Sequence, residues 1–151
     1  MGTEEQAKEH FSSGLNCAES VLLALSKGLA LNDGARAFIP MMATGFGGGI
    51  ALNGDTCGAL NGAVIAIGLT LGRSKPTQSR NQCYRAVDRL YQDFKKEFGT
   101  CKCCELTGVD LKTEEGLNAV HGRIREERCK PIVEWTTKRT NQIIQELAGS
   151  S

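Results

Sequence analysis

Apolar residues recur at three- and four-residue intervals along much of this chain. The clearest example runs from Gln78 to Phe98, where one face is charged or polar and the other carries Cys83, Val87, Leu90, Tyr91, Phe94 and Phe98. Such a stripe predicts an amphipathic helix with one face against a core. The sequence shows no convincing strand alternation, internal repeat or low-complexity linker, so we expect an all-α fold.

Capping signals place two helices near the amino terminus. Residues 3–12 are predicted to form a short helix ended by Gly14, because glycine readily takes the left-handed conformation that closes a helix. Asn16 then starts a second helix, with Glu19 three residues later in a variant of the capping box and Cys17 in the first turn. Further helices are expected at residues 34–42 with an interruption at Pro40, at residues 113–120 after Thr113, and at residues 131–147 from Pro131.

Glycines mark the middle of the chain. Five of the ten residues from Gly45 to Gly54 are glycine, which favours a loop over a helix. Asp55 or Thr56 is expected to cap the helix that follows, in which Gly58 and Gly62 share a face and let another backbone approach closely. We therefore expect a single-domain bundle of about five to seven helices over residues 1–148, with this helix central and buried, and a disordered tail at residues 149–151.

Charge and length exclude some classes of partner. The chain has 151 residues and a formal net charge of only +1, so neither nucleic acid nor an anionic membrane is expected to bind it. The longest apolar run, residues 59–71, is shorter than the roughly 20 residues that a membrane span needs. The first residues are charged and lack the apolar segment of a signal peptide, so we expect a cytoplasmic protein whose thiols are reduced.

Seven cysteines are the most unusual feature of the composition. An odd count without a signal peptide does not fit a secreted disulfide framework, and in a reducing compartment many cysteines indicate redox chemistry or metal binding. Cys17, Cys57 and Cys129 are each predicted at or near a helix start, where unpaired N–H groups stabilise a thiolate. Positive charge nearby has the same effect, and it is supplied by Lys102 beside Cys103 and by Arg125, Arg128 and Lys130 around Cys129.

Packing is the alternative for every one of these thiols, since unpaired cysteine is often buried as a small hydrophobe. Cys83 lies on an apolar stripe and fits packing, whereas Cys17 and Cys57 remain open between packing and chemistry. Three cysteines crowd the turn predicted at residues 99–108, where adjacent thiols bridge poorly without strain, so at least one of them should face a distant partner: Cys101, Cys103 or Cys104. His10 and His121 are expected at the solvated surface, and Trp135 is expected to pack.

Metal binding stays open as an alternative. The paired short spacings typical of zinc sites are absent except near residues 101–104, but four cysteines from separate helices could still converge on zinc or an iron–sulfur cluster. The glycine-rich loop could cradle an anion with its N–H groups, yet no phosphate-binding lysine motif follows it. We interpret it as a structural loop that brings Cys57 to a site.

At residues 57–62 the chain reads Cys-Gly-Ala-Leu-Asn-Gly, and there it resembles the redox-active family named for its pattern, C_GCAxxG_C_C. The resemblance extends to Asn16-Cys17-Ala-Glu-Ser-Val, to Phe98-Gly followed by Cys103 and Glu-Leu-Thr-Gly, and to Cys129 before the last helix. It implies that four cysteines form the working set, with three others as extras. Those four are Cys17, Cys57, Cys103 and Cys129, although Cys101 and Cys104 compete for the role of Cys103.

These observations favour a thiol-based redox protein, acting as a thiol–disulfide oxidoreductase without a required cofactor. In this hypothesis Cys57 attacks as a helix-terminal thiolate, one of the other three cysteines resolves the mixed disulfide, and the partner is a small-molecule thiol or disulfide or an unidentified redox protein. One alternative is a zinc or iron–sulfur module on the same four cysteines. Another is a structural helical oligomer, such as a homodimer, with packing cysteines.

Overall fold

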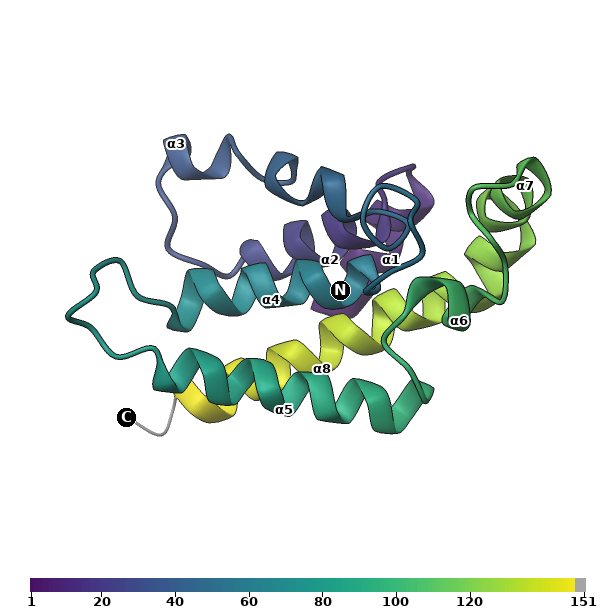
Figure 1. Cartoon of the computed structure of the whole chain (residues 1–151). Coiled ribbons are helices and arrows are strands. Elements are labelled where there is room, and N and C mark those ends of the chain that lie inside the picture. Colours follow the sequence, from purple (N-terminus) through teal and green to yellow (C-terminus); the bar gives the residue numbers. More distant parts are fainter. Residues whose placement is uncertain (149–151) are drawn as a thin grey trace.

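The computed structural model describes residues 1–148, and within them it contains helices and no strand, which confirms the all-α prediction (Figure 1). The elements are α1 (Thr3–Ser12), α2 (Cys17–Ser26), α3 (Asp33–Arg36), the 3₁₀ helix η1 (Met41–Phe46), α4 (Gly58–Leu71), α5 (Asn81–Phe98), α6 (Cys103–Thr107), α7 (Glu114–His121), the π-helical turn η2 (Arg125–Cys129) and α8 (Lys130–Ala148). The number of α-helices exceeds the expected five to seven because it includes α3 and α6, which are single turns. The expected tail at residues 149–151 lies outside the described residues.

Helix α4 lies against α2, α5 and α8, while α6 and α7 gather at one end of the bundle (Figure 1). Its buried positions are Gly58, Ala59, Leu60, Gly62, Ala63, Ala66 and Ile67. The small residues bring α2 close, because a Cβ at Gly62 would lie 3.0 Å from the Cα of Ala18. The glycine spacing thus predicted the close approach correctly. No helix within residues 1–148 combines the length and apolarity needed to cross a membrane.

The capping box at the start of α2 is complete, as predicted. The Asn16 side chain accepts a hydrogen bond from the Glu19 amide at 2.9 Å, and the Glu19 carboxylate accepts one from the Asn16 amide at 2.7 Å. The same two side chains bond Thr44 of η1, through its carbonyl at 3.0 Å and its hydroxyl at 2.7 Å. The cap therefore also holds the approach to the glycine-rich loop against α2.

The helix expected at residues 34–42 divides in two. Asn32 accepts a hydrogen bond from the Ala35 amide at 2.8 Å and starts α3, which ends at Arg36. The chain then passes Pro40 and enters η1, so the predicted interruption at the proline is present but the boundaries differ. The pattern of apolar residues does not indicate this earlier helix start. Asn32 does indicate it, because asparagine is a preferred N-cap residue.

Helix α5 begins at Asn81 rather than at Gln78. The Gln78 side chain instead closes the preceding loop by accepting hydrogen bonds from the amides of Ser74 and Lys75, at 2.9 and 3.2 Å. The apolar stripe packs as predicted at Leu90 and Phe94, which are fully buried, but Tyr91 at its edge is 40% exposed, so the prediction is wrong for that residue. Aromatic contacts join α5 to α8 and confirm the packing role of Trp135, whose indole meets the rings of Phe94 and Phe98 at centroid distances of 6.0 and 5.2 Å.

The prediction that the last helix starts at Pro131 is wrong. Residues 123–130 are already helical, with a π turn over Arg125–Cys129. A proline inside a helix lacks an N–H and crowds the carbonyl four residues earlier, here that of Glu127, and the wider π turn relieves that crowding. Cys129 consequently lies inside a continuous helix and has no free helix N-terminus beside it.

Candidate functional site

Two helix N-termini meet at Cys17 and Cys57. Cys17 is the first residue of α2 and Cys57 is the N-cap of α4. Gly58 permits their approach, because a Cβ there would lie 2.5 Å from the Cys17 sulfur and 2.7 Å from the Phe46 carbonyl oxygen. The two thiols are hydrogen-bonded to each other. The predicted helix-start positions of Cys17 and Cys57 are thus correct, and the fold makes the two residues neighbours.

The environment of this pair favours a thiolate on Cys17. The hydrogen bond from the Cys57 thiol lowers the pKa of Cys17 to about 7 against the opposing effect of burial, with help from the amides of Gly48, Ala18 and Ala59. The pKa of Cys57 is raised well above its usual range by the same hydrogen bond, by burial and by the Cys17 charge. Cys17 therefore carries the negative charge while Cys57 remains the donor.

The glycine-rich loop takes an unusual backbone path beside Cys17. From Gly48 to Leu52, five consecutive residues have φ between 48° and 66°, including the non-glycine residues Ile50 and Ala51. Left-handed backbone costs an L-residue about 1–2 kcal/mol, and such strain gathers at functional sites. The path aims the Gly48 amide at the Cys17 sulfur. Only glycine fits at position 49, since a Cβ there would lie 2.6 Å from the Cβ of Cys103.

The segment at residues 101–104 pairs with the end of this loop. The Cys57 amide donates to the Cys101 carbonyl at 2.7 Å, and the Cys103 amide donates to the Asp55 carbonyl at 2.7 Å. An isolated antiparallel bridge joins Thr56 to Lys102 between them. This pairing uses the backbone that a cap at Asp55 or Thr56 would need, so the predicted cap is wrong and Cys57 takes the N-cap position.

The same pairing corrects the expectation of a plain turn at residues 99–108. Residues 103–107 form α6, and Cys103 is its first residue. Of the three helix-start thiols predicted, two are present, and Cys103 is a helix-start thiol that the sequence pattern did not indicate. Its carbonyl accepts a hydrogen bond from the Thr107 hydroxyl at 2.7 Å, which closes the short helix.

A pocket of about 280 Å³ collects three of the four expected cysteines. Cys17, Cys103 and Cys129 come to it from α2, α6 and η2, and Cys57 lies behind Cys17 with only 6% of its surface exposed. The other residues that line the pocket are Asn16, Thr44, Gly47, Gly48, Ala51, Leu52, Val120 and His121. The structure thus brings together the residues predicted as the working set.

Cys103 and Cys129 differ from Cys17 in their protonation. Burial raises the pKa of each to about 12, and the negative charge of Cys17 adds to the effect. Arg125 lowers the pKa of Cys129, but only as the smallest of three influences. Arg128 donates to the Leu106 carbonyl at 3.2 Å and Lys130 pairs with Glu126 at 3.1 Å. The expectation that these cations favour a Cys129 thiolate is therefore wrong, because burial outweighs them.

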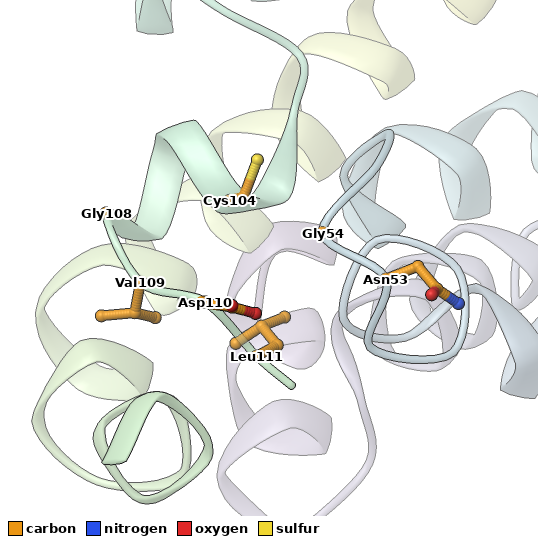
Figure 2. A pocket seen from close by; sticks show the side chains of 7 residues that line it. All are labelled: Asn53, Gly54, Cys104, Gly108, Val109, Asp110 and Leu111. Carbon is orange, nitrogen blue, oxygen red and sulfur yellow. The ribbon is translucent and has the colours of Figure 1, made fainter. Parts of the chain in front are cut away.

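The remaining thiols lie elsewhere. Cys101 is buried, and burial raises its pKa. Cys104 is exposed on a separate pocket of about 470 Å³, and in Figure 2 its sulfur points away from Asp110 and Leu111. Cys83 is half-buried on α5 with a pKa raised by burial, as packing predicts. Among the cysteines of the crowded segment, only Cys103 reaches the pocket that Cys17 lines.

Of the two histidines expected at the solvated surface, His121 is exposed as predicted and His10 is not. His121, at the end of α7, is exposed but lines the thiol pocket. No sequence signal indicated that His121 lines the pocket. Its position there depends on the turn at Gly122, which follows α7 and leads toward η2 and α8. His10 is half-buried, its pKa is lowered by burial, and its Nε2 is a buried nitrogen without a partner in the described structure. The expectation of a solvated surface therefore fails for His10.

The donor arrangement bears on the metal alternative. All seven cysteines lie within residues 1–148 and are free thiols. Over those residues, no group of three or more histidine, cysteine, aspartate or glutamate side chains is arranged to hold a metal ion. The pocket thiols are thus close enough to influence one another's protonation without forming a ligand set.

Comparison with known proteins agrees with the resemblance stated above. Residues 15–143 match the model of the family described as "Putative redox-active protein (C_GCAxxG_C_C)". An uncharacterized protein of Archaeoglobus fulgidus is 33% identical over 128 residues, which cover 76% of this chain and 83% of that protein. No solved structure matches. Because the family match covers most of the chain, including all four cysteines of the predicted working set, this protein belongs to the C_GCAxxG_C_C family.

Proposed function

We propose that the protein exchanges electrons with disulfides and that Cys17 and Cys57 form its reacting dithiol. The observation that carries the proposal is the hydrogen-bonded pair at two converging helix N-termini, with Cys17 open to a pocket and Cys57 behind it. A thiolate is the attacking species in disulfide exchange, and the best attacking thiol has a pKa near the ambient pH. Cys17 meets this requirement.

The reaction proceeds in two exchanges. The Cys17 thiolate attacks one sulfur of a substrate disulfide, forms a mixed disulfide and expels the other substrate sulfur as a thiolate, which takes up a proton. Cys57 then loses its proton and attacks the Cys17 sulfur, which forms the Cys17–Cys57 disulfide and releases the second substrate thiolate. The substrate gains two electrons and the protein loses two. A thiol donor reverses both exchanges and restores the dithiol.

The assignment of roles differs from the sequence hypothesis, in which Cys57 attacks. Cys17 receives amide hydrogen bonds from Gly48, Ala18 and Ala59 in addition to the Cys57 thiol, and it is the member of the pair that lines the pocket. Cys57 is buried and positioned to resolve the mixed disulfide. Both residues remain necessary, so replacement of Cys57 still abolishes complete turnover.

Pocket size and lining restrict the substrate. At about 280 Å³ the pocket lies near the lower end of the 300–1,000 Å³ typical of ligand sites. Its walls are mostly small and apolar, from Gly47, Ala51, Leu52 and Val120. These walls suit the narrow end of a disulfide, either a small aliphatic one or a cystine presented by a partner protein, better than a bulky charged molecule.

Trapping the mixed disulfide tests the proposal. Anaerobically reduced protein is mixed with one equivalent of bis(2-hydroxyethyl) disulfide, quenched with an alkylating agent and mapped by peptide mass spectrometry. Wild type is expected to yield the Cys17–Cys57 disulfide. C57S is expected to accumulate the hydroxyethyl adduct on Cys17, and C17S to form neither product. C83S is the matched control, because it removes a half-buried thiol outside the pocket, and it should behave as wild type.

Two outcomes would overturn the proposal. One is an adduct that forms on Cys57 in C17S as fast as adducts form in wild type. The other is stoichiometric metal in anaerobically purified protein with the pocket thiols unavailable to alkylation, which would support the zinc or iron–sulfur alternative. Both are measured on the same preparation by metal analysis, a visible spectrum and a thiol count.

A further inference from the structure

Two thiols are enough for the reaction proposed above, yet the pocket holds more. Cys103 and Cys129 come from α6 and η2 to the same pocket as Cys17. Both respond to the charge of Cys17, and Cys103 also responds to that of Cys129. Cys17 is therefore the thiol whose charge acts on both of the other thiols that line the pocket.

We propose that Cys103 and Cys129 form a second dithiol couple, which exchanges with the Cys17–Cys57 couple through Cys17 and makes the pocket a four-electron unit. The inference rests on the proposed function of Cys17 and Cys57. It assigns a redox role to two thiols, the buried Cys103 and the half-buried Cys129, that the first couple does not use. It also explains why three cysteines from distant segments open into one small pocket.

Backbone and side-chain hydrogen bonds hold the elements that carry Cys103 and Cys129 beside the pocket. The Cys103 amide is bonded to the Asp55 carbonyl at 2.7 Å, which fixes the start of α6 beside the glycine-rich loop. Arg128 donates to the Leu106 carbonyl at 3.2 Å and so ties η2 to α6. Cys129 is the last residue of the π turn, where the helical hydrogen-bond ladder is already irregular. A local shift there brings its thiol toward Cys103 with less disruption than in a regular helix.

The transfer step balances without an outside reagent. With the first couple oxidised, Cys103 loses its proton and attacks the Cys17 sulfur, which forms a Cys17–Cys103 disulfide and releases Cys57 as a thiolate that takes up that proton. Cys129 then loses its proton and attacks the Cys103 sulfur, which forms the Cys103–Cys129 disulfide and releases the Cys17 thiolate. Two electrons move from the second couple to the first. The first couple is then ready for another substrate disulfide.

The charge on Cys17 supports this order of events. While Cys17 is a thiolate, its charge helps to hold Cys103 and Cys129 in the protonated form. Oxidation of Cys17 to a disulfide removes that charge, so the second couple loses a proton more easily only after the first couple has reacted. Burial still opposes ionisation of the second couple, but the oxidation of Cys17 removes the next largest influence against it.

A thiol count against oxidant separates this inference from the proposed function. Reduced full-length protein is titrated anaerobically with bis(2-hydroxyethyl) disulfide, and free thiols are counted and disulfides mapped. Wild type is expected to lose four thiols in two steps, with Cys17–Cys57 and Cys103–Cys129 disulfides at the end. C103S and C129S should lose only the two thiols of the first couple, with C129S also yielding some Cys17–Cys103 disulfide. C104S, which removes the exposed neighbour of Cys103, is the control and should still lose four.

The outcomes point to different conclusions. If wild type loses two thiols and yields only the Cys17–Cys57 disulfide, the second couple does not exist and the proposed function stands. If no Cys17–Cys57 disulfide forms in any variant, the proposed function fails first. If Cys103–Cys129 forms equally well in C17S, the second couple reacts directly with the oxidant and the transfer through Cys17 is wrong.

Discussion

The two thiol pairs at the site are built from the same residue type, yet only the Cys17–Cys57 pair contains a thiol whose pKa is lowered. At the α2–α4 junction, Cys17 receives hydrogen bonds from three amides and from Cys57, and its pKa falls to about 7 despite burial. At the α6–η2 junction, Cys103 and Cys129 lack such donors among their influences, and burial raises the pKa of each to about 12. The hydrogen bond from the Cys57 thiol, followed by the amides of Gly48, Ala18 and Ala59, distinguishes Cys17 from Cys103 and Cys129, since burial raises the pKa of all three.

Arg125 stabilises a Cys129 thiolate less than its nearby positive charge would suggest. Arg125 lies near Cys129 and lowers its pKa, yet this influence is smaller than that of burial and of the Cys17 charge. Its guanidinium is already engaged with the Leu15 carbonyl at 2.9 Å and with the Phe11 ring at 3.6 Å. Because this cation is committed to other partners, it does not overcome the burial of Cys129.

The largest expected effect is a difference in labelling rate between Cys17 and Cys129, which are both half-buried on one pocket. At pH 7 the lowered pKa of Cys17 and the raised pKa of Cys129 both favour Cys17, and the greater intrinsic nucleophilicity of the higher-pKa thiolate offsets only part of this difference, so Cys17 should label faster by at least on the order of 100-fold. Iodoacetamide labelling of the two tryptic peptides measures it. In C17S, removal of the charge should speed up Cys129, and equal rates in wild type would contradict the contrast.

The next largest expected effect is the loss of stability when α2 and α4 are forced apart. In G62A, the new methyl group meets the Ala18 backbone, and such overpacking costs about 2–3 kcal/mol in the free energy of unfolding. G68A is the matched control on the same helix, where a Cβ would meet nothing within 4 Å, and it should be neutral or more stable by up to about 1 kcal/mol. Denaturant unfolding of both variants tests this. Equal stabilities would mean that the α2–α4 contact is not as close as described.

Removing the Cys57 thiol should reduce the difference in pKa between Cys17 and the other thiols of the pocket without abolishing it. In C57A the hydrogen bond to Cys17 is lost, so the pH midpoint of Cys17 labelling should rise by about one unit, with a loss of roughly fivefold in rate at pH 7. C57S keeps a hydrogen-bond donor and should fall between C57A and wild type. The midpoint is read from labelling rates between pH 5.5 and 9. A midpoint unchanged in C57A would assign the stabilisation to the amides alone.

The smallest effect concerns the strained loop that supplies the Gly48 amide. Ala51 has a φ of 48°, so A51G removes left-handed strain of about 1–2 kcal/mol and adds about 0.5–1 kcal/mol of backbone entropy cost. A net gain of about 0.5–1 kcal/mol in unfolding free energy is expected. A119G, at a helical position in α7, should instead lose about 1 kcal/mol. Thermal unfolding compares the two, and a loss of stability in A51G would show that the loop is not strained there.

Much of the secondary structure could be predicted because its causes are local. The bounds of α1, the capping box of α2, the Thr113 cap of α7 and the apolar face of α5 all follow from residues within a few positions of one another. The start of α8 could not be predicted in this way. Proline is tolerated at a helix start, and it is also tolerated inside a helix where a preceding π turn relieves its crowding. The sequence around Pro131 does not distinguish these two cases.

The same distinction between local and long-range causes applies to the candidate site. By itself, the sequence determined the all-α fold, the helix-start positions of Cys17 and Cys57 and the glycine-rich loop between them, because hydrophobic spacing, caps and glycine act over short distances. Only the tertiary structure decided that Cys57 donates to Cys17, that Cys103 starts a helix paired with Asp55, and that His121 joins the pocket. The pKa of each thiol depends on burial and on donors from segments far apart in the chain, and no local pattern encodes either.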